Sequence, residues 1–340
     1  MLSRLIVVSV TFGFVLSNAV LANDLPPQQF AEFKSCELAS GETLTPCRIG
    51  YRTVGELNAD KSNVVVVPTW HTGTSESHLM LTQTALDPTQ YFIVIIDALS
   101  NGVSSSPSNH PNTAGGAFPT ITIADMVDTQ HRLLTETLDL QQAHAFVGLS
   151  MGGMQTFEWL VRYPDFAGRA VSTIGSPRLP TFDIALWTTN INLLALLRAC
   201  DCEEARAAMA AQRMTLEVPS KLTADIPRER TLEYITKQVA SDTMTLAQTW
   251  DKQRQAEAMI THNIARNFDD DMRKAAEQIS ARLLVIVGAD DRVVTPGPAK
   301  AISTMVGGEL LEMDSDCGHY EPLCSPDIFG NAVTDFLAAD

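Results

Sequence analysis

Gly148-Leu149-Ser150-Met151-Gly152-Gly153 is the stretch of sequence that decides the fold. An apolar run at 143–147 precedes it, and a helical pattern at 154–161 follows it. A G-x-S-x-G string is common by chance, but at a strand–turn–helix junction it is typical of a nucleophile elbow. The flanking glycines let strand and helix approach closely, which lifts the Ser150 hydroxyl out of the backbone at a helix N-terminus, where negative charge is favoured. We therefore expect Ser150 to be a nucleophile; the alternative is a glycine-rich turn with an incidental serine.

Short apolar runs rich in β-branched residues alternate with helical patterns on both sides of this stretch. The runs lie at 63–68, 91–97, 143–148, 170–175, 282–288 and, more briefly, 309–313. This alternation predicts an α/β fold with a mostly parallel sheet covered by helices on both faces. A turn around Gly41 predicts an antiparallel hairpin at the edge of that sheet. Thr122 and Thr295 are the predicted N-caps of two of the helices.

Residues 178–279 break the alternation, because they contain helical patterns and no strand-like run. They lie between the fourth and fifth parallel runs. Open α/β sheets bind ligands at the carboxyl ends of their strands, so an insertion at this point predicts a helical lid over the site. The predicted core domain is then formed by 23–177 and 280–340 together.

A serine hydroxyl needs a base that takes its proton, so a histidine is required. His319 is our candidate, because it follows the last predicted strand and precedes the last predicted helix. The third member of such a triad is an acidic residue, which we expect after the predicted strand 282–288. Asp290 and Asp291 both lie there. We prefer Asp291 and leave Asp290 open. The resulting order of serine, aspartate and histidine differs from that of trypsin-like and subtilisin-like enzymes.

Two backbone N–H groups must stabilise the oxyanion of an acyl-transfer reaction. The residue after the nucleophile, Met151, supplies one. The loop after the run 63–68 is expected to supply the other, and we choose His71, with Gly73 letting this loop turn close to the substrate. The candidates for lining the substrate pocket are Trp70, Trp187 and Tyr320, and the alternative for each is a packing role, with Trp187 in the core.

The first 22 residues have the three-part layout of a secretory signal peptide. Arg4 provides a positive charge, an apolar stretch follows, and short residues precede a cleavage site expected after Ala22. The apolar stretch is too short to span a bilayer comfortably, which takes about 20 residues. An uncleaved membrane anchor is the alternative. We expect a periplasmic or secreted protein with no membrane association beyond export.

Six cysteines fall into three close pairs, as expected of disulfides in an exported chain, although the sequence leaves their connectivity open. Cys36 and Cys47 flank the turn around Gly41 and can face each other across two strands. A bond between Cys200 and Cys202 would close a strained ring, and we do not expect it. The third pair is Cys317 with Cys324. No C-x₂-C repetition suggests a zinc site, and we expect no metal.

The composition, with 45% hydrophobic and 19% charged residues, is that of an ordinary globular protein. The formal net charge of −16 disfavours nucleic acid and anionic membrane surfaces as partners, because both repel an acidic protein. A small-molecule acyl ester is the expected partner. A homodimer is left open.

Taken together, the motifs resemble the homoserine O-acetyltransferase-like family of the α/β-hydrolase superfamily. The resemblance covers 36–175 well and the triad region adequately, and it implies an α/β-hydrolase fold, a helical lid and acylation of Ser150 during turnover. The matching strings are Gly41-Glu42-Thr43-Leu44, 51–58, Thr72-Gly73 with His78, 118–127 with Gln130, and 150–155 with Glu158-Trp159.

Two departures from that family concern the substrate. Members that act on homoserine have an aspartate directly after the catalytic histidine, where this chain has Tyr320 followed by Glu321. Their lid also has an arginine-and-tyrosine helix that holds the amino acid's carboxylate. We find no such pattern in 178–279, and Trp187 stands near the position of the arginine. Loss of both charged anchors would remove recognition of a zwitterion.

The leading hypothesis is an exported serine hydrolase that cleaves a small ester, with an amide or a lactone as further options. Water resolves the acyl-enzyme on Ser150, since an exported enzyme would not meet acetyl-CoA in ordinary amounts. The alternative is an O-acyltransferase that moves an acetyl group from acetyl-CoA to an alcohol. A minor alternative is a non-catalytic binding protein on the same fold. No cofactor is expected.

Overall fold

The computed structural model describes residues 25–216, 224, 226–240 and 243–339, so the expected signal peptide at 1–22 lies outside the described residues. An eight-stranded sheet with the order β1-β4-β6-β5-β7-β8-β9-β10 forms its centre. Its strands are β1 Gln29–Phe33, β4 Cys47–Val54, β5 Val64–Pro68, β6 Phe92–Ile96, β7 Ala143–Leu149, β8 Ala167–Thr173, β9 Arg282–Gly288 and β10 Glu309–Met313. The six predicted runs are β5 to β10, and these six strands are mutually parallel, which confirms the predicted fold class.

The antiparallel edge differs from the prediction. The turn around Gly41 joins β2 (Cys36–Glu37) and β3 (Thr43–Leu44), which form a separate two-stranded sheet. The edge of the main sheet is β1, which pairs with β4, and β4 in turn pairs antiparallel with β6. Strand β4 has the sequence CRIGYRTV, whose arginines and glycine interrupt the apolar pattern by which a strand is predicted. It forms because it pairs with β1 and with β6, which is distant in the chain.

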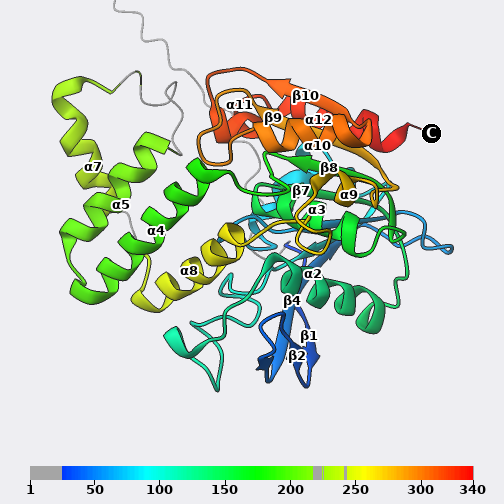
Figure 1. Ribbon diagram of the computed structural model, residues 1–340, viewed down its shortest axis with the longest axis horizontal. Coiled ribbons are helices and arrows are strands. Elements are labelled where there is room, and N and C mark those ends of the chain that lie inside the picture. The colour runs from blue at the N-terminus through cyan, green and yellow to red at the C-terminus, as the bar shows by residue number, and fades with distance from the viewer. Residues whose placement is uncertain (1–24, 217–223, 225, 241–242, 340) are drawn as a thin grey trace, which may run out of the picture.

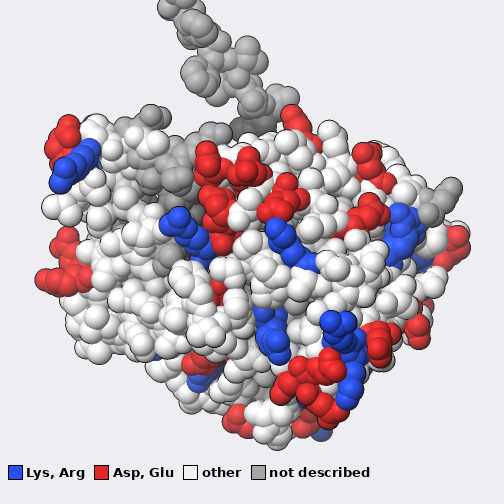
Figure 2. All heavy atoms as spheres, turned by 45° about the horizontal axis from the view of Figure 1, so that its top comes forward, with Lys and Arg blue, Asp and Glu red and all other residues white. Residues whose placement is uncertain are grey.

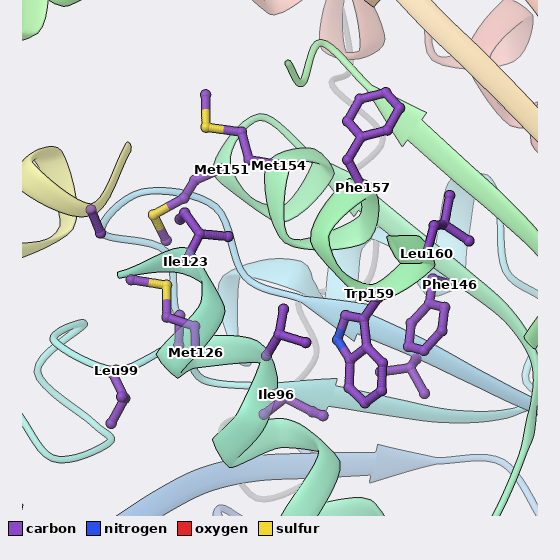
Figure 3. Close-up of a cluster of buried hydrophobic side chains, with 14 of the residues drawn as sticks. Ile96, Leu99, Ile123, Met126, Phe146, Met151, Met154, Phe157, Trp159 and Leu160 are labelled. Carbon is purple, nitrogen blue, oxygen red and sulfur yellow. The ribbon is translucent and has the colours of Figure 1, made fainter. Parts of the chain in front are cut away.

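Alternate residues of the parallel strands face two different hydrophobic clusters, as the period of two in a strand requires. On one face, Val64 and Val66 join the cluster that contains α2 (Ile123–Arg132), α3 (Met151–Arg162) and α10 (Gly297–Val306). Figure 3 shows part of this cluster, with Met126 from α2 and Trp159 from α3. On the other face, Val65 belongs to the cluster that contains α1 (Leu81–Thr84) and α12 (Pro326–Ala338).

The predicted caps have different outcomes. Thr122 is the N-cap of α2 and forms a capping box with Asp125. The prediction for Thr295 is wrong: Pro296 is the N-cap of α10, and the Thr295 hydroxyl donates to Asp183 instead. The remaining short elements are α9 Met272–Ala276, α11 Glu321–Cys324, a π-helix at Leu133–Thr137, and 3₁₀ turns at Ser77–Met80, Gly115–Ala117, Arg228–Arg230 and Gly318–Tyr320.

Four longer helices follow β8 and precede β9 in the chain: α4 Thr181–Cys200, α5 Glu203–Leu216, α7 Thr231–Ala240 and α8 Leu246–Ile260. In this part of the chain, the described residues contain no strand apart from one isolated bridge between Arg178 and Asn263. Helix α4 packs against α5 and α8. These helices lie together at one end of the molecule, beside the sheet (Figure 1).

All six cysteines form disulfides: Cys36–Cys47, Cys200–Cys202 and Cys317–Cys324. The expectation that Cys200 and Cys202 stay apart is therefore wrong. Asp201 between them has the left-handed conformation, with φ 44°, at the C-cap of α4. This turn of the chain brings the two Cα atoms to 5.1 Å, which is within disulfide range.

The surface shown in Figure 2 carries acidic and basic side chains interspersed over a mostly uncharged background, with no continuous basic patch on that face. Within the described ranges, no helix is both long enough and apolar enough to cross a membrane. The same residues contain no group of three or more histidine, cysteine or acidic side chains that could hold a metal ion.

Candidate active site

Ser150 lies at the turn between β7 and α3, with φ 55° and ψ −121°. A Cβ on Gly148 would lie 2.1 Å from the Gly152 carbonyl oxygen, and one on Gly152 would lie 2.4 Å from the Pro68 carbonyl oxygen. The strand, the helix and the neighbouring loop therefore come too close for any side chain at these two positions. The Ser150 N–H donates to the Thr173 carbonyl at 2.8 Å, which anchors the strained turn to β8.

The structure brings Ser150, His319 and Asp291 into one hydrogen-bonded chain. The distance from His319 Nε2 to Ser150 Oγ is 2.9 Å, and the distance from His319 Nδ1 to Asp291 Oδ2 is 2.7 Å. With the proton on Nδ1, the imidazole donates to the carboxylate and leaves Nε2 to accept from the serine hydroxyl. This is the arrangement that allows a histidine to act as a general base.

The two neighbouring aspartates have different partners. Asp291 contacts His319, and its second oxygen accepts the N–H groups of Val293 and Val294 at 2.8 and 3.0 Å. Asp290 accepts the N–H of Gly318 at 3.0 Å, so it holds the backbone of the histidine loop rather than the imidazole. Asp291, and not Asp290, is thus the carboxylate that contacts the His319 imidazole.

Most N–H groups of the loop after β5 already have acceptors within the protein. Trp70 N–H donates to His78 Nε2, and Thr72 N–H donates to Gln255 Oε1. Gly73 N–H donates to the Trp70 carbonyl. In the described part of the chain, the N–H groups of His71 and of Met151 have no such acceptor, as expected if both face a substrate oxygen.

Two histidines, the half-buried His71 and the buried His78, stabilise this loop as neutral side chains. Burial lowers the pKa of His71 to about 4 and that of His78 to about 3. His71 Nε2 lies 3.2 Å from the Lys252 carbonyl on α8, while His78 Nδ1 lies 2.9 Å from the Thr74 carbonyl. A Cβ at Gly73 would lie 2.6 Å from the Trp70 ring, so a glycine is needed here. The reason is packing against Trp70, whereas the sequence suggested closeness to the substrate.

A cavity of about 360 Å³ opens above Ser150. The three residues expected to line a pocket, Trp70, Trp187 and Tyr320, all lie in its wall. The other wall residues are His71, Thr72, Leu149, Ile174, Asn190, Met209, Arg213, Lys252, Val293, His319, Pro322 and Leu323. Much of this wall is apolar, which suits a small acyl or alcohol group.

Sequence reasoning missed the two cationic wall residues, Arg213 of α5 and Lys252 of α8. The described residues of the wall include no acidic side chain. Arg213 follows Met209 by one helical turn, so the two share a helix face, and this spacing was visible in the sequence. Which face of α5 turns toward Ser150 depends on packing between helices, and no local pattern indicates that.

The chain belongs to the alpha/beta hydrolase fold family, whose family model matches residues 65–322. It is similar to an ethyl acetate hydrolase from Pseudomonas veronii, with 43% identity over 145 residues, which are 42% of each chain. It is also similar to a homoserine O-acetyltransferase from Chlorobium chlorochromatii, with 39% identity over 146 residues, 40% of each chain. The chain thus matches less than half the length of these relatives.

The fold extends beyond the part that is similar in sequence. An acetylester hydrolase from Corynebacterium glutamicum has a solved structure that matches with a TM-score of 0.82. The match covers 92% of this chain and 96% of that chain at 24% identity. At this level of identity the likeness concerns the fold alone. The expected resemblance to homoserine O-acetyltransferases is confirmed, and the fold is shared with ester hydrolases.

Proposed function

We propose that this protein is a serine hydrolase that cleaves a small ester through an acyl-enzyme on Ser150. The observation that carries the proposal is the chain of hydrogen bonds from Ser150 through His319 to Asp291, at the floor of a largely apolar cavity. The similarity to an ethyl acetate hydrolase supports a small acyl ester as the substrate class.

Each step of the mechanism uses a group described above. Ser150 Oγ attacks the ester carbonyl while His319 Nε2 takes the hydroxyl proton, and Asp291 holds the imidazolium that forms. The N–H groups of His71 and Met151 stabilise the oxyanion. His319 then gives the proton to the leaving alcohol. A water molecule repeats the sequence on the acyl-enzyme, releasing the acid and restoring the Ser150 hydroxyl.

We assign the helices of 178–279 as a lid over a core formed by 23–177 and 280–340. Trp187 from α4 and Lys252 from α8 reach the cavity that contains Ser150, which supports the assignment. Three disulfides support the expected export to the periplasm or the medium, because such bonds persist in oxidising compartments.

The test is nitrophenolate release from p-nitrophenyl acetate by the wild-type protein beside Ser150→Ala. A hydrolase shows steady turnover that the variant lacks, and added alcohols leave the rate of release unchanged. A wild-type protein with no Ser150-dependent release from acetyl, butyryl or thioacetyl esters would contradict the proposal.

A second candidate, O-acyltransfer to an alcohol, is favoured by Arg213 and Lys252 in the cavity wall. Two cationic side chains suit an acceptor or a donor that carries negative charge. The same assay separates the two reactions when homoserine is added and the products are analysed by mass spectrometry. An acyltransferase releases a burst of nitrophenolate that stalls until the acceptor is added, and it forms the acetylated alcohol.

A further inference from the structure

Asp183 is an acidic residue of the inserted helices, in the first turn of α4, and it is fully buried. Its Oδ2 accepts the N–H of Thr295 at 2.9 Å and the Thr295 hydroxyl at 3.3 Å. Its Oδ1 is buried and has no hydrogen-bond partner among the described residues. Burying a carboxylate with one oxygen unpaired is unfavourable, which indicates a role that an apolar side chain could not fill.

Thr295 lies near the end of the loop that joins β9 to α10, and Asp291 lies in the same loop. The Asp291 Oδ1 atom accepts the N–H groups of Val293 and Val294, so the orientation of this carboxylate follows the backbone of those two residues. The next residue is Thr295, the partner of Asp183. A shift of this backbone would therefore turn Asp291 relative to the imidazole.

Helix α4 also contacts the same loop at a second point. Trp187 lies one helical turn after Asp183, and its Nε1–H donates to the Val293 carbonyl at 3.3 Å. Two side chains on one face of α4 therefore hold the loop at residues 293 and 295, on either side of Val294.

We propose that Asp183 is a positioning residue of the active site: by holding Thr295, it fixes the loop that orients Asp291 toward His319. Asp183 acts through Asp291 and does not contact the substrate. The inference rests on the function proposed above, because it assigns Asp183 a part in the same reaction.

The charge of Asp183 also acts on the site. Burial is the main reason that the pKa of Asp183 is raised to about 6, against the lowering effect of the Thr295 hydrogen bonds. The charged groups that act on it are Asp291, after β9, which raises this pKa, and His319, after β10, which lowers it. The interaction with His319 is mutual, so an ionised Asp183 favours the protonated imidazole.

Three variants test the proposal. Asp183→Ala removes the acceptor, whereas Asp183→Asn keeps an acceptor oxygen for Thr295 and removes the charge. The matched control is Asp251→Ala on α8. Asp251 is likewise buried, and it accepts the N–H of Ser108 at 2.8 Å. Its other oxygen is buried without a partner among the described residues, and Asp251 forms no hydrogen bond with the triad.

The kinetic test is kcat and KM for p-nitrophenyl acetate between pH 5 and pH 9. We expect Asp183→Ala to lower kcat by about 10-fold or more with little change in KM, because a small misplacement of a catalytic group is costly. Asp183→Asn restores most of kcat, and the acidic limb of its kcat/KM profile moves to lower pH because the imidazole is protonated less readily. Asp251→Ala keeps the wild-type kcat. If Asp183→Ala folds and keeps the wild-type kcat, the proposal is wrong.

A second readout does not depend on ester turnover. The His319 Nδ1–H bonded to Asp291 is expected to give a far-downfield proton resonance, identified by its loss in His319→Gln. Asp183→Ala shifts or broadens this resonance, whereas Asp183→Asn and Asp251→Ala retain it. An unchanged resonance in Asp183→Ala would overturn the proposal even if the wild-type protein proves not to be an esterase. If Asp183→Ala does not fold, the pH profile of Asp183→Asn decides, and an acidic limb of kcat/KM at the wild-type pH would count against the proposal.

Discussion

At the scale of single residues, the course of the backbone determines which of two adjacent carboxylates, Asp290 or Asp291, contacts His319. Asp290 accepts the Gly318 N–H, and Asp291 accepts two N–H groups of its own loop while it contacts His319. The sequence placed both aspartates after the correct strand, because parallel strands end at one edge of the sheet. It could not separate them conclusively, since the direction of each side chain depends on the turn of the loop.

The pair supplies a matched test of the proposed acid. We expect Asp291→Asn to lower kcat by roughly 10³- to 10⁴-fold, because an amide no longer favours the Nδ1–H tautomer of His319. Asp290→Asn keeps an oxygen that can accept the Gly318 N–H, so its kcat should stay within a few-fold of the wild-type value. Steady-state kinetics at pH 8 measure both variants. Equal losses in the two would argue against Asp291 as the orienting acid.

At the scale of elements, most of the strands that were visible in the sequence are apolar runs buried in the sheet, and the mostly exposed β10 is the exception. Strand β5 is all valine before its proline, and the burial of each residue is complete. Strands β1 and β4 were missed, because their sequences contain charged residues and their pairing is set by distant partners. Packing between distant elements also explains why the sequence predicted helices in 178–279 but did not indicate which of their faces reach Ser150.

The loop that carries His319 is closed by the Cys317–Cys324 disulfide. The Cys36–Cys47 disulfide closes a loop of similar length far from Ser150 in the sequence, so it serves as a control. Replacing either pair with alanine should lower the free energy of unfolding by about 2–3 kcal/mol. Only the Cys317→Ala/Cys324→Ala variant should also lower kcat, because the histidine loses its fixed position. Urea unfolding and kinetics measure the two effects. Equal kcat values in both double variants would contradict this role.

At the scale of the whole molecule, three histidines with lowered pKa values link folding to pH. Burial lowers the pKa of His71 to about 4, and those of His78 and His262 to about 3. In the unfolded chain such groups titrate near about 6.5. Below this pH the unfolded chain binds more protons than the folded protein does. Their contribution to stability is therefore present above about pH 6.5 and is lost as the pH falls.

We expect the free energy of unfolding to decrease by about 1–3 kcal/mol per pH unit between pH 6.5 and pH 5. The raised pKa values of Asp183, Glu158 and Asp251 oppose this trend, because these carboxyl groups bind protons more readily in the folded protein. The lowered pKa values of His131 and His144 add to the trend. Urea unfolding at pH 7, 6 and 5 measures the slope. A stability that is constant or rises as the pH falls would show that the histidines are not buried as neutral groups.

The central claim is that Ser150 attacks the substrate and carries its acyl group. The most direct measurement is peptide mass spectrometry after treatment with a fluorophosphonate, which reacts with activated serines. We expect one adduct, on the peptide that contains Ser150, and expect it to form far more slowly in His319→Gln and to be absent in Ser150→Ala. An adduct that persists in Ser150→Ala, or an unlabelled wild-type protein that still hydrolyses esters, would contradict the account.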